Sequence, residues 1–523
     1  MQKLLVPFLS AAIVVATIPV LGADRPELLV GLAGHAFDHL GNIDAQARAA
    51  VMSGATIIYG TGFGALGYGG LPVTEKIEEA HRTTKGYLAE AKRNGLQLAF
   101  GYVCATSMVK LETFDRNWPK EFHAQFSSPP SDWLQQDQDG KALPSWYGGE
   151  YRPACMNNPD WRAYEKFIVR QQIEAGFDGI FFDNPTVHAQ GCFCRYCMTE
   201  FSLFLFHEGG EVPTPTKNSL DSIRKLAKSQ PRDFMRFRCT IAANFLTEMG
   251  NYARTLKRDA LITANNSLNA PEAFFAQSRT NGYNIFELSK AEDLVVVEDM
   301  ANQPRLLADG RVAEYGPIYE MIAAISHRKP IIAATIADAD YHTPPSLVRL
   351  AMAEAAAHNA SYLGWPTWPE EQRMKMISGI RPQANFLKQY ANLLNDTAPA
   401  GDTVLFLPVR QYTETADCQP MKVARALGAA NVQFDVVSEE DFAQKIKVKN
   451  PPVWLIESPG SLIESETGLL DAFKRRGGKV IWTENANWLD DLQATIDKPS
   501  LKLQGPATVR AVVRDLPKKR IVH

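Results

Sequence analysis

At 523 residues the chain is too long for a single hydrophobic core, so two or three domains are expected. Apolar residues make up 45% of the sequence and charged residues 22%, which is ordinary for a soluble globular protein. The formal net charge of -3 gives no reason to expect a nucleic acid or an anionic membrane as a partner.

Residues 1–23 have the pattern of a secretory signal peptide. Lys3 is followed by an uncharged run that ends in Gly22 and Ala23, before Asp24. A cationic start, an apolar core and small residues at the end are typical of such signals. We therefore expect cleavage after this run, export to the periplasm or the medium, and no membrane association afterwards. The run is also long enough to span a bilayer, so an uncleaved anchor is the alternative.

Residues 24–390 alternate between short apolar runs and helical patterns. Each apolar run is nearly continuous, as expected for strands buried on both faces of a parallel sheet. Helical patterns lie between the runs, for example over residues 75–94 and 161–175. Eight such alternations predict a (β/α)8 TIM barrel, with a doubly wound open sheet as the alternative. The predicted strands cover residues 28–31, 56–59, 98–102, 179–182, 261–264, 294–297, 330–334 and 362–365.

Two long insertions interrupt this alternation. Residues 103–158 follow the third predicted strand and are rich in Trp, Asp, Gly and Pro, and residues 184–229 follow the fourth. Both insertions leave the C-terminal ends of strands. We therefore expect both to cover the mouth of the barrel.

A second, smaller α/β unit is expected over residues 400–490. Its predicted strands lie at 403–406, 432–437, 453–456 and 480–482, with helical patterns between them. This order predicts a flavodoxin-like, doubly wound fold. The turn after its first strand contains no glycine, which argues against a nucleotide site. Residues 500–523 alternate as a short β tail does, and we interpret them as the possible start of a further β domain.

Asp183 is the first candidate for catalysis. It follows the apolar strand 179–182, and the C-terminal ends of barrel strands are where such folds hold their active sites. The alternative is that Asp183 only caps a turn with Asn184. Asp178 lies before the same strand, on the opposite face, and we expect it to be structural.

Glycoside cleavage usually needs a second carboxylate. Glu298 and Asp299 follow the sixth predicted strand, whereas Asp338 and Asp340 lie further out in the loop after the seventh. We expect Asp183 to work with Glu298 in preference to the others, one as acid and one as nucleophile or base, in either order. The alternative for each is a loop carboxylate in a salt bridge.

Other polar and aromatic residues lie near predicted strand ends or in the insertions. Aromatic rings stack on the apolar face of a pyranose, while amide, imidazole and guanidinium groups bind its hydroxyls. The candidate substrate-binding residues are His35, Tyr59, Arg152, Asn184, Asn265, Trp365 and Trp368.

Cys192, Cys194 and Cys197 place three thiols in one short loop. The chain has seven cysteines, and an odd number with three crowded together suits a metal better than a disulfide framework. A closed tetrahedral Zn²⁺ site needs a fourth ligand. A disulfide with free thiols is the alternative. The candidates for the fourth ligand are, in order of preference, Cys155, Cys104 and His188.

This pattern resembles the β-galactosidases of glycoside hydrolase family 42 and their barrel relatives. That family carries a Cys-Tyr-Cys-Pro-x-Cys loop and a Tyr-Cys-x-Asn-Ser-Pro segment. Here residues 192–197 read CFCRYC and residues 154–159 read ACMNNP. The resemblance implies a structural zinc ion held by the quartet Cys155, Cys192, Cys194 and Cys197. It also places the acid/base at Asp183, and implies an oligo- or polysaccharide substrate and a trimerisation-like second domain, hence a homo-oligomer.

Two positions depart from the family pattern. The Asn-Glu pair of the fourth strand is replaced by Phe182 and Asp183, and the nucleophile at the end of the seventh strand falls on Thr335. A threonine cannot serve as that carboxylate. Acids at strands four and six are similar to those of α-galactosidase-type and fucosidase-like barrels, which leaves the anomeric preference open.

The sequence therefore predicts an exported glycoside hydrolase-like enzyme with a structural zinc site. Two alternatives remain. One is a catalytically silent barrel that binds carbohydrate. The other is a metal-dependent hydrolase that uses His35, Asp38 and His39, which follow the first predicted strand.

Overall fold

The structure is a computed structural model of the chain. It describes residues 31–33, 52, 54–60, 67–208, 219–267, 277–298, 314–334, 344–364, 370–395, 397–412, 419–448 and 453–523. The predicted signal peptide and the residues His35, Asp38 and His39 lie outside these ranges. Within them, no helix combines the length and the apolar character that crossing a bilayer requires.

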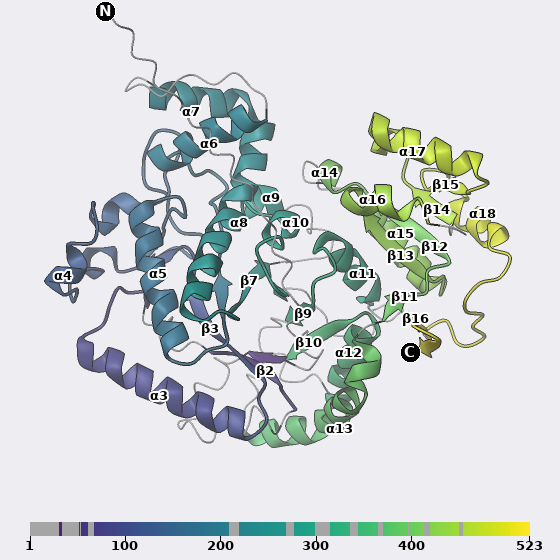
Figure 1. The fold of residues 1–523 in the computed structure, drawn as a ribbon, viewed down its shortest axis with the longest axis horizontal. Coiled ribbons are helices and arrows are strands. Elements are labelled where there is room, and N and C mark those ends of the chain that lie inside the picture. The colour runs from purple at the N-terminus through teal and green to yellow at the C-terminus, as the bar shows by residue number, and fades with distance from the viewer. Residues whose placement is uncertain are drawn as a thin grey trace, which may run out of the picture.

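Eight parallel strands close into a barrel in the order β1-β10-β9-β8-β7-β6-β3-β2, with β1 paired to β2 (Figure 1). The TIM-barrel prediction is confirmed, and each predicted strand is found within a few residues of its expected place. The strands are β1 (Gly31–Ala33), β2 (Ile57–Gly60), β3 (Leu98–Cys104), β6 (Gly179–Asp183), β7 (Leu261–Ser267), β8 (Val295–Glu298), β9 (Ile331–Ala334) and β10 (Ala360–Gly364).

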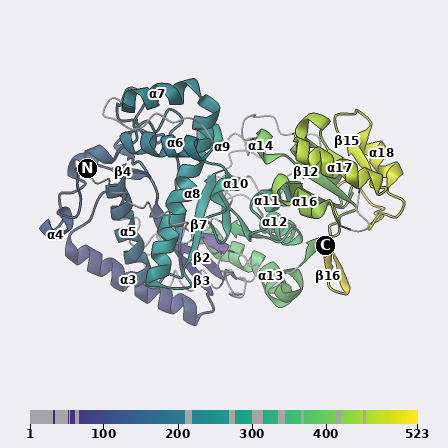
Figure 2. The same cartoon turned by 45° about the horizontal axis from the view of Figure 1, so that its top comes forward.

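Helices follow the strands and surround the barrel (Figures 1 and 2). One of them, α5, begins where the sequence supplies a cap, since the Asn158 side chain accepts bonds from the backbone N–H groups of Asp160 and Trp161. Pro159 occupies its first turn. The helices are α3 (Thr74–Arg93), α5 (Pro159–Glu174), α6 (Arg195–His207), α7 (Ser219–Ser229), α8 (Pro231–Leu256), α9 (Gln277–Thr280), α10 (Ile285–Leu288), α11 (Gly316–Ile325), α12 (Pro345–Ala357) and α13 (Glu370–Leu394).

The two faces of the barrel strands belong to different cores. Inside the barrel, Phe100 and Phe181 pack on Tyr59 with ring centroids 5.2 and 5.0 Å away. Outside it, Phe182 packs against Phe245 of α8. Alternate residues of a strand point to opposite faces, so a strand buried on both sides carries a continuous apolar run. This is why the strands were readable from the sequence.

The first insertion, between β3 and α5, packs onto the hydrophobic core outside the barrel. Its strands β4 (Ser107–Val109) and β5 (Tyr151–Pro153) pair antiparallel, and its Trp118 and Trp133 are buried together with Tyr164 of α5. The rings of Trp118 and Trp133 stack with centroids 5.8 Å apart. The insertion also contains the short helices η2 (Leu111–Thr113), α4 (Lys120–His123) and η3 (Pro130–Trp133).

A separate four-stranded parallel sheet follows the barrel, in the order β13-β12-β14-β15. This order is that of a flavodoxin-like, doubly wound sheet, as predicted. The domain boundaries at residues 390 and 400 stay predictions. The elements are β12 (Thr403–Leu407), α14 (Val409–Tyr412), α15 (Gln419–Ala429), β13 (Phe434–Ser438), α16 (Glu439–Lys445), β14 (Val453–Ile456), η5 (Pro459–Ser461), α17 (Glu464–Arg475), β15 (Val480–Trp482) and α18 (Trp488–Thr495).

The predicted β tail forms a hairpin. Its strands are β16 (Val513–Leu516) and β17 (Lys519–Val522), and β16 pairs antiparallel with β11 (Ala398–Pro399) between the barrel and the second sheet. Arg514 of β16 reaches Glu320 of α11 at 2.7 Å. The hairpin therefore ties the end of the chain back to the barrel.

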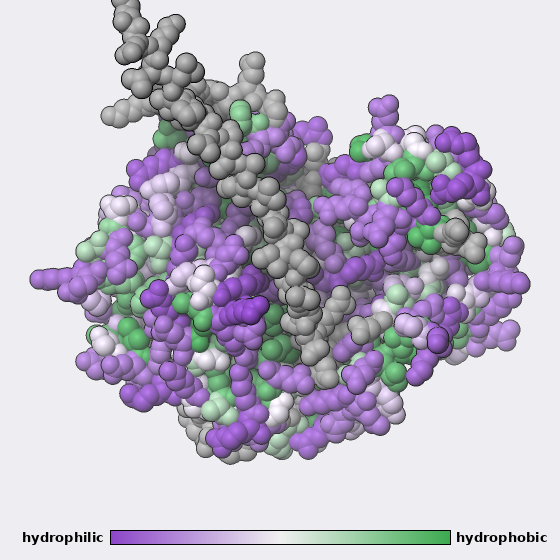
Figure 3. Space-filling view, viewed as in Figure 1, coloured by the Kyte–Doolittle hydropathy of each residue, from purple (hydrophilic) through white to green (hydrophobic). Residues whose placement is uncertain are grey.

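Barrel and second sheet meet along α11, which packs on α15 and β13 (Figures 1 and 2). A cavity of about 630 Å³ lies close by and is lined by residues of α12, α13, β17 and the end of the chain, among them Glu354, Phe386 and His523. Asp183 is not among its lining residues. The face shown in Figure 3 is mostly hydrophilic, with apolar side chains in scattered patches.

Candidate active site and metal centre

Asp183 is the last residue of β6, at the C-terminal end of the barrel. Its backbone carbonyl still accepts a hydrogen bond from the Ala105 backbone N–H, at 2.8 Å. The next residue, Asn184, has φ 50°, a left-handed conformation that asparagine tolerates better than most residues. The chain therefore turns sharply as it leaves the strand. Asp183 therefore lies at the C-terminal end of its strand, as predicted.

Three side chains donate hydrogen bonds to the Asp183 carboxylate. The Tyr102 hydroxyl, from β3, lies 2.5 Å from Oδ2, and the Asn184 amide reaches the same oxygen at 2.8 Å. Asn265 of β7 donates to Oδ1, also at 2.8 Å. The carboxylate is thus held from both neighbouring strands of the barrel, with β3 and β7 flanking β6.

Burial raises the pKa of Asp183, although the hydrogen bonds from Tyr102 and Asn265 lower it in part. Burial also raises the pKa of Tyr102, and the negative charge of Asp183 adds to the rise. Tyr102 therefore remains a hydroxyl donor, while Asp183 holds its proton to a higher pH than a free aspartate. A carboxyl group in this state is suited to general acid chemistry.

A second layer of side chains surrounds these contacts. The Tyr68 and Tyr102 hydroxyls are hydrogen-bonded to each other. Tyr147, from the first insertion, donates to the Asn184 amide oxygen at 2.7 Å. Cys104 is buried beside Asp183, and burial raises the pKa of its thiol to about 11.

The sequence analysis missed Tyr102, Tyr68 and Tyr147. Tyr102 carried a usable signal, because it alternates with Phe100 along a strand and so shares its inward face. Tyr68 and Tyr147 lie in irregular segments, and no pattern in the sequence marks them.

Four of the predicted substrate-binding residues can be placed. Asn184 and Asn265 both contact Asp183, as described above. Tyr59 lies inside the barrel, 3% exposed, rather than on the open rim where a sugar ligand was expected. The Arg152 guanidinium donates to the backbone carbonyls of Gly149 and Tyr151, at 2.9 and 2.7 Å, so it fastens its own loop.

The other predicted residues are only partly described or not described at all. Glu298 ends β8 and is in register with Ser267 of β7, so its backbone lies at the same end of the barrel as Asp183. Its side chain is outside the described part of the chain, and the Asp183–Glu298 pair stays a prediction. The positions that lie wholly outside are His35, Asp299, Thr335, Trp365 and Trp368, with Asp338 and Asp340.

Asp178, at the other end of β6, behaves as a structural residue. It accepts hydrogen bonds from Lys92 and Lys257, both at 2.9 Å, and from the Ala99 backbone N–H at 3.0 Å. Burial alone would raise the pKa of Asp178, but the two lysines lower it. The carboxylate therefore links β6 to β3, to the end of α3 and to the residue that follows α8.

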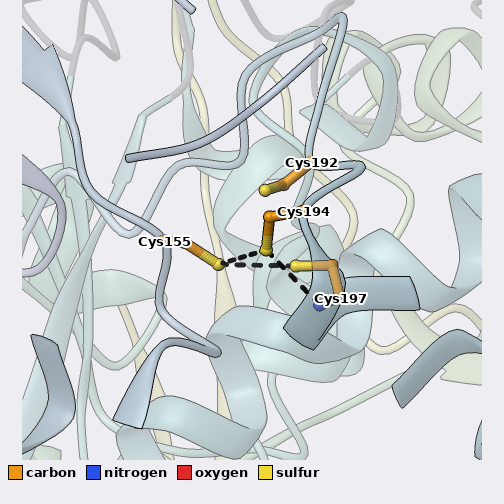
Figure 4. A group of neighbouring side chains, drawn as sticks. All are labelled: Cys155, Cys192, Cys194 and Cys197. Carbon is orange, nitrogen blue, oxygen red and sulfur yellow. Dashed lines mark hydrogen bonds between the residues drawn. The ribbon is translucent and has the colours of Figure 1, made fainter. Parts of the chain in front are cut away.

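Four cysteines from the two long insertions converge on one another (Figure 4). Cys155 comes from the end of the first insertion, and the other three come from the loop before α6 and its first turn. All four are buried, and their sulfur atoms lie within 4.8 Å of one another. The pairs Cys155–Cys194 and Cys155–Cys197 are both 3.5 Å apart, and the described cysteines are free, which argues against the disulfide alternative.

The cluster fits a tetrahedral metal ion. With a zinc–sulfur distance near 2.3 Å, two ligands of a tetrahedron lie roughly 3.8 Å apart, close to the observed separations. Backbone or amide N–H groups also point at three of the sulfurs, since Gln136 donates to Cys192, Asn157 to Cys197, and the Cys197 backbone to Cys194. Such donors stabilise thiolates in metal sites. The alternative ligands Cys104 and His188 are not part of the group.

Solved structures resemble this arrangement of barrel and second sheet. The cold-adapted β-galactosidase of Rahnella sp. R3 aligns with 88% of this chain and 71% of its own, with 13% identity and a TM-score of 0.58. The fold is that of the family-42 β-galactosidases.

Two further solved structures, one of them named as a different glycosidase, are similar to this chain. A catalytic mutant of a GH42 β-galactosidase from G. stearothermophilus aligns with 87% of this chain and 71% of its own, with 12% identity and a TM-score of 0.58. The α-L-fucosidase isoenzyme 2 of Paenibacillus thiaminolyticus aligns with 88% and 62%, with 13% identity and a TM-score of 0.53. No protein-family model matches the sequence, and no curated protein is significantly similar to it. The likeness is therefore one of fold.

Proposed function

We propose that this protein is a glycoside hydrolase in which Asp183 is the proton donor to the glycosidic oxygen. The observation that carries the proposal is the state of that carboxyl group. It lies at the C-terminal end of the barrel, its pKa is raised by burial, and Tyr102 and Asn265 fix its orientation. A fixed acid that holds its proton to a higher pH than a free aspartate is suited to protonating a leaving oxygen.

Glu298 is the proposed partner of Asp183. It ends β8, at the same end of the barrel and one strand beyond Asn265. A separation of about 5 to 5.5 Å between the two carboxyl groups would make the enzyme retaining, and about 6.5 to 9.5 Å would make it inverting. Asp299 is the reserve candidate for the same role.

The proposed substrate is an oligo- or polysaccharide. The structures of similar fold include enzymes named β-galactosidase and α-L-fucosidase, which act on opposite anomers. The fold thus supports a carbohydrate substrate and leaves the sugar and the anomer to experiment.

The cysteine quartet is proposed to hold a structural zinc ion. Four thiolates close the coordination sphere, so the ion would have no open position for water or substrate. When bound, it would cross-link the end of the first insertion to the loop that follows Asp183. From the pattern of residues 1–23 we further propose that the chain is exported and is not held at the membrane once this segment is cleaved. From the resemblance to family 42 we propose that it forms a homo-oligomer.

The test is hydrolysis of a panel of nitrophenyl glycosides and of plant and algal polysaccharides. We expect at least one of them to be cleaved, and the variant Asp183→Asn to lose at least about 100-fold in kcat on a polysaccharide, because a sugar leaving group, unlike nitrophenolate, must be protonated to leave. Asp139→Asn, an exposed aspartate of the first insertion, is the matched control and should match wild type. Unchanged hydrolysis of a polysaccharide by Asp183→Asn would refute the role of Asp183.

A catalytically silent carbohydrate-binding protein is the second candidate. It is favoured by Thr335, which takes the place of the family's nucleophile in the sequence. It predicts binding of glycans without turnover on any member of the panel.

A further inference from the structure

Three aromatic side chains form an exposed cluster on the first insertion. Trp146, Tyr147 and Tyr151 are 37, 56 and 38% exposed. Their rings are in contact, with centroids 5.9 Å apart between Trp146 and Tyr147 and 5.5 Å apart between Tyr147 and Tyr151. Isolated exposed aromatics are ordinary, but three in contact form a continuous apolar surface, which usually marks a binding site.

This cluster is connected to the candidate active site by hydrogen bonds. The Tyr147 hydroxyl donates to the Asn184 amide oxygen at 2.7 Å, and the Asn184 amide nitrogen donates to Asp183 at 2.8 Å. Burial of the hydroxyl end raises the pKa of Tyr147, and the charge of Asp183 adds to the rise. The hydroxyl of Tyr147 thus lies at Asn184, next to Asp183 in the chain, while 56% of the side chain remains exposed.

The loop that carries the cluster is held by specific contacts. Gly148 and Gly149 adopt left-handed conformations, with φ 69° and 58°, and give the tight turn between Tyr147 and Tyr151. The Arg152 guanidinium donates to two carbonyls of the same loop, as described above. The rings are therefore presented by a fastened turn.

The fold does not need these rings for its core. The insertion already buries Trp118 and Trp133, which are 8 and 0% exposed, and Trp118 stacks both on Trp133 and on Tyr164 of α5. The exposed cluster is separate from this buried set. Core packing therefore does not explain why these three rings lie next to the candidate active site.

We propose that Trp146, Tyr147 and Tyr151 are a stacking platform for sugar units of a glycan whose scissile residue lies at Asp183. Aromatic faces bind the apolar C–H face of a pyranose, while the hydroxyl or indole N–H contacts its polar edge. The inference rests on the proposed function and narrows it. The preferred substrate is an oligo- or polysaccharide that reaches the platform, because a simple monosaccharide glycoside would leave it empty.

The test is a binding assay in the Asp183→Asn background, where the glycan is not consumed. The probes are neutral tetrasaccharides of cellulose, β-1,4-galactan, laminarin and mannan and a fucosylated tetrasaccharide, with affinities measured by calorimetry. We expect at least one to bind, and Trp146→Ala and Tyr151→Ala each to weaken its binding by about tenfold. Tyr147→Phe keeps the ring and loses the bond to Asn184, so it should lose less affinity than Tyr147→Ala.

Phe206→Ala is the matched control. Phe206 is a 66% exposed aromatic on α6, outside the cluster, and its removal should leave binding unchanged. The melting temperature of each variant is measured as well. A value equal to that of the Asp183→Asn parent shows that a loss of affinity does not come from unfolding. Equal affinity of all variants for every probe, or no binding of any probe, would overturn the inference.

The two proposals fail separately. Binding that depends on Trp146 without turnover by the wild type would refute hydrolysis and support the platform. Turnover of an oligosaccharide with kcat/KM unaffected by Trp146→Ala and Tyr151→Ala would refute the platform and support hydrolysis.

Discussion

The Tyr102 hydroxyl lies 2.5 Å from Oδ2 of Asp183, and the two residues lie on the neighbouring barrel strands β3 and β6. Tyr102 is itself hydrogen-bonded to Tyr68, so the carboxyl group is backed by two phenols, the buried Tyr102 and the half-buried Tyr68. Burial raises the pKa of Asp183, and the Tyr102 hydroxyl, together with Asn265, limits how far that pKa rises above the value of a free aspartate.

The first prediction concerns the pH profile of Tyr102→Phe. The lost hydroxyl stabilised the charged carboxylate, so its removal should raise the pKa of Asp183 further. If Asp183 donates a proton, the alkaline limb of kcat/KM must move to higher pH, and the rate should fall by about tenfold because orientation is also lost. Initial rates over pH 4 to about 10 on the best substrate would measure both effects.

Tyr252→Phe is the control for this prediction. The Tyr252 hydroxyl bonds Arg170 on the outside of the barrel, and its loss should leave the pH profile unchanged. A limb that moves to lower pH in Tyr102→Phe would contradict the assignment of Asp183 as the acid.

The second prediction concerns stability. The pKa of Asp183 is raised on folding, so the folded state is favoured while the group is protonated and is penalised as pH rises above the unfolded value of about 3.9. Asp183→Asn, which carries no charge, should therefore be more stable than wild type at pH 7 by on the order of 1 kcal/mol, and equal to it near pH 3. Urea unfolding at the two pH values measures the difference in free energy of unfolding between variant and wild type. A variant less stable than wild type at pH 7 would contradict the prediction.

The sequence predicted this site only in part, for physical reasons. Asp183 was predicted because it is the first polar residue after an apolar strand and so lies at the C-terminal end of the barrel. The cysteine quartet was predicted because three of its four cysteines lie close together in the sequence. The tyrosines were not found, because Tyr102 and Asp183 are 81 residues apart and meet only when β3 pairs with β6. Tyr59 was expected on the rim, but its inward register on β2 puts it inside the barrel.

The third prediction concerns the cysteine quartet. Purified protein should contain one metal ion per chain, zinc by elemental analysis, and Cys155→Ser should lose it. Because the site cross-links the first insertion and the loop after Asp183, its loss should destabilise the protein by several kcal/mol, at least about 3.

Cys104→Ser tests the specificity of that loss. Cys104 is buried in the barrel but is not in the quartet, so this variant should keep its metal. Full metal content in Cys155→Ser, or a wild type free of metal after purification without chelators, would reject the zinc site.

The fourth prediction concerns the ion pair that joins the C-terminal hairpin to the barrel. Glu320 accepts hydrogen bonds from Arg514 and His358, at 2.7 and 2.8 Å, and both acid and arginine are almost fully buried. Burial alone would raise the pKa of Glu320, but Arg514, His358 and Arg328 lower it to about 2. An acid whose pKa falls on folding stabilises the protein above its unfolded pKa of about 4.3, and that stability is lost as pH falls toward 2.

Arg514→Met removes the main partner and leaves a buried carboxylate. We expect a loss of about 3 kcal/mol at pH 7, measured by urea unfolding, which shrinks as pH falls below about 4 because Glu320 then takes up a proton. Adding Glu320→Gln should recover part of the loss, since the pair is then replaced without an unpaired charge. Arg520→Met removes an exposed partner of Asp515 on the same hairpin and should have no measurable effect. A loss in Arg514→Met that stays constant from pH 7 to pH 3 would show that packing of the arginine, not its charge, holds the hairpin on α11.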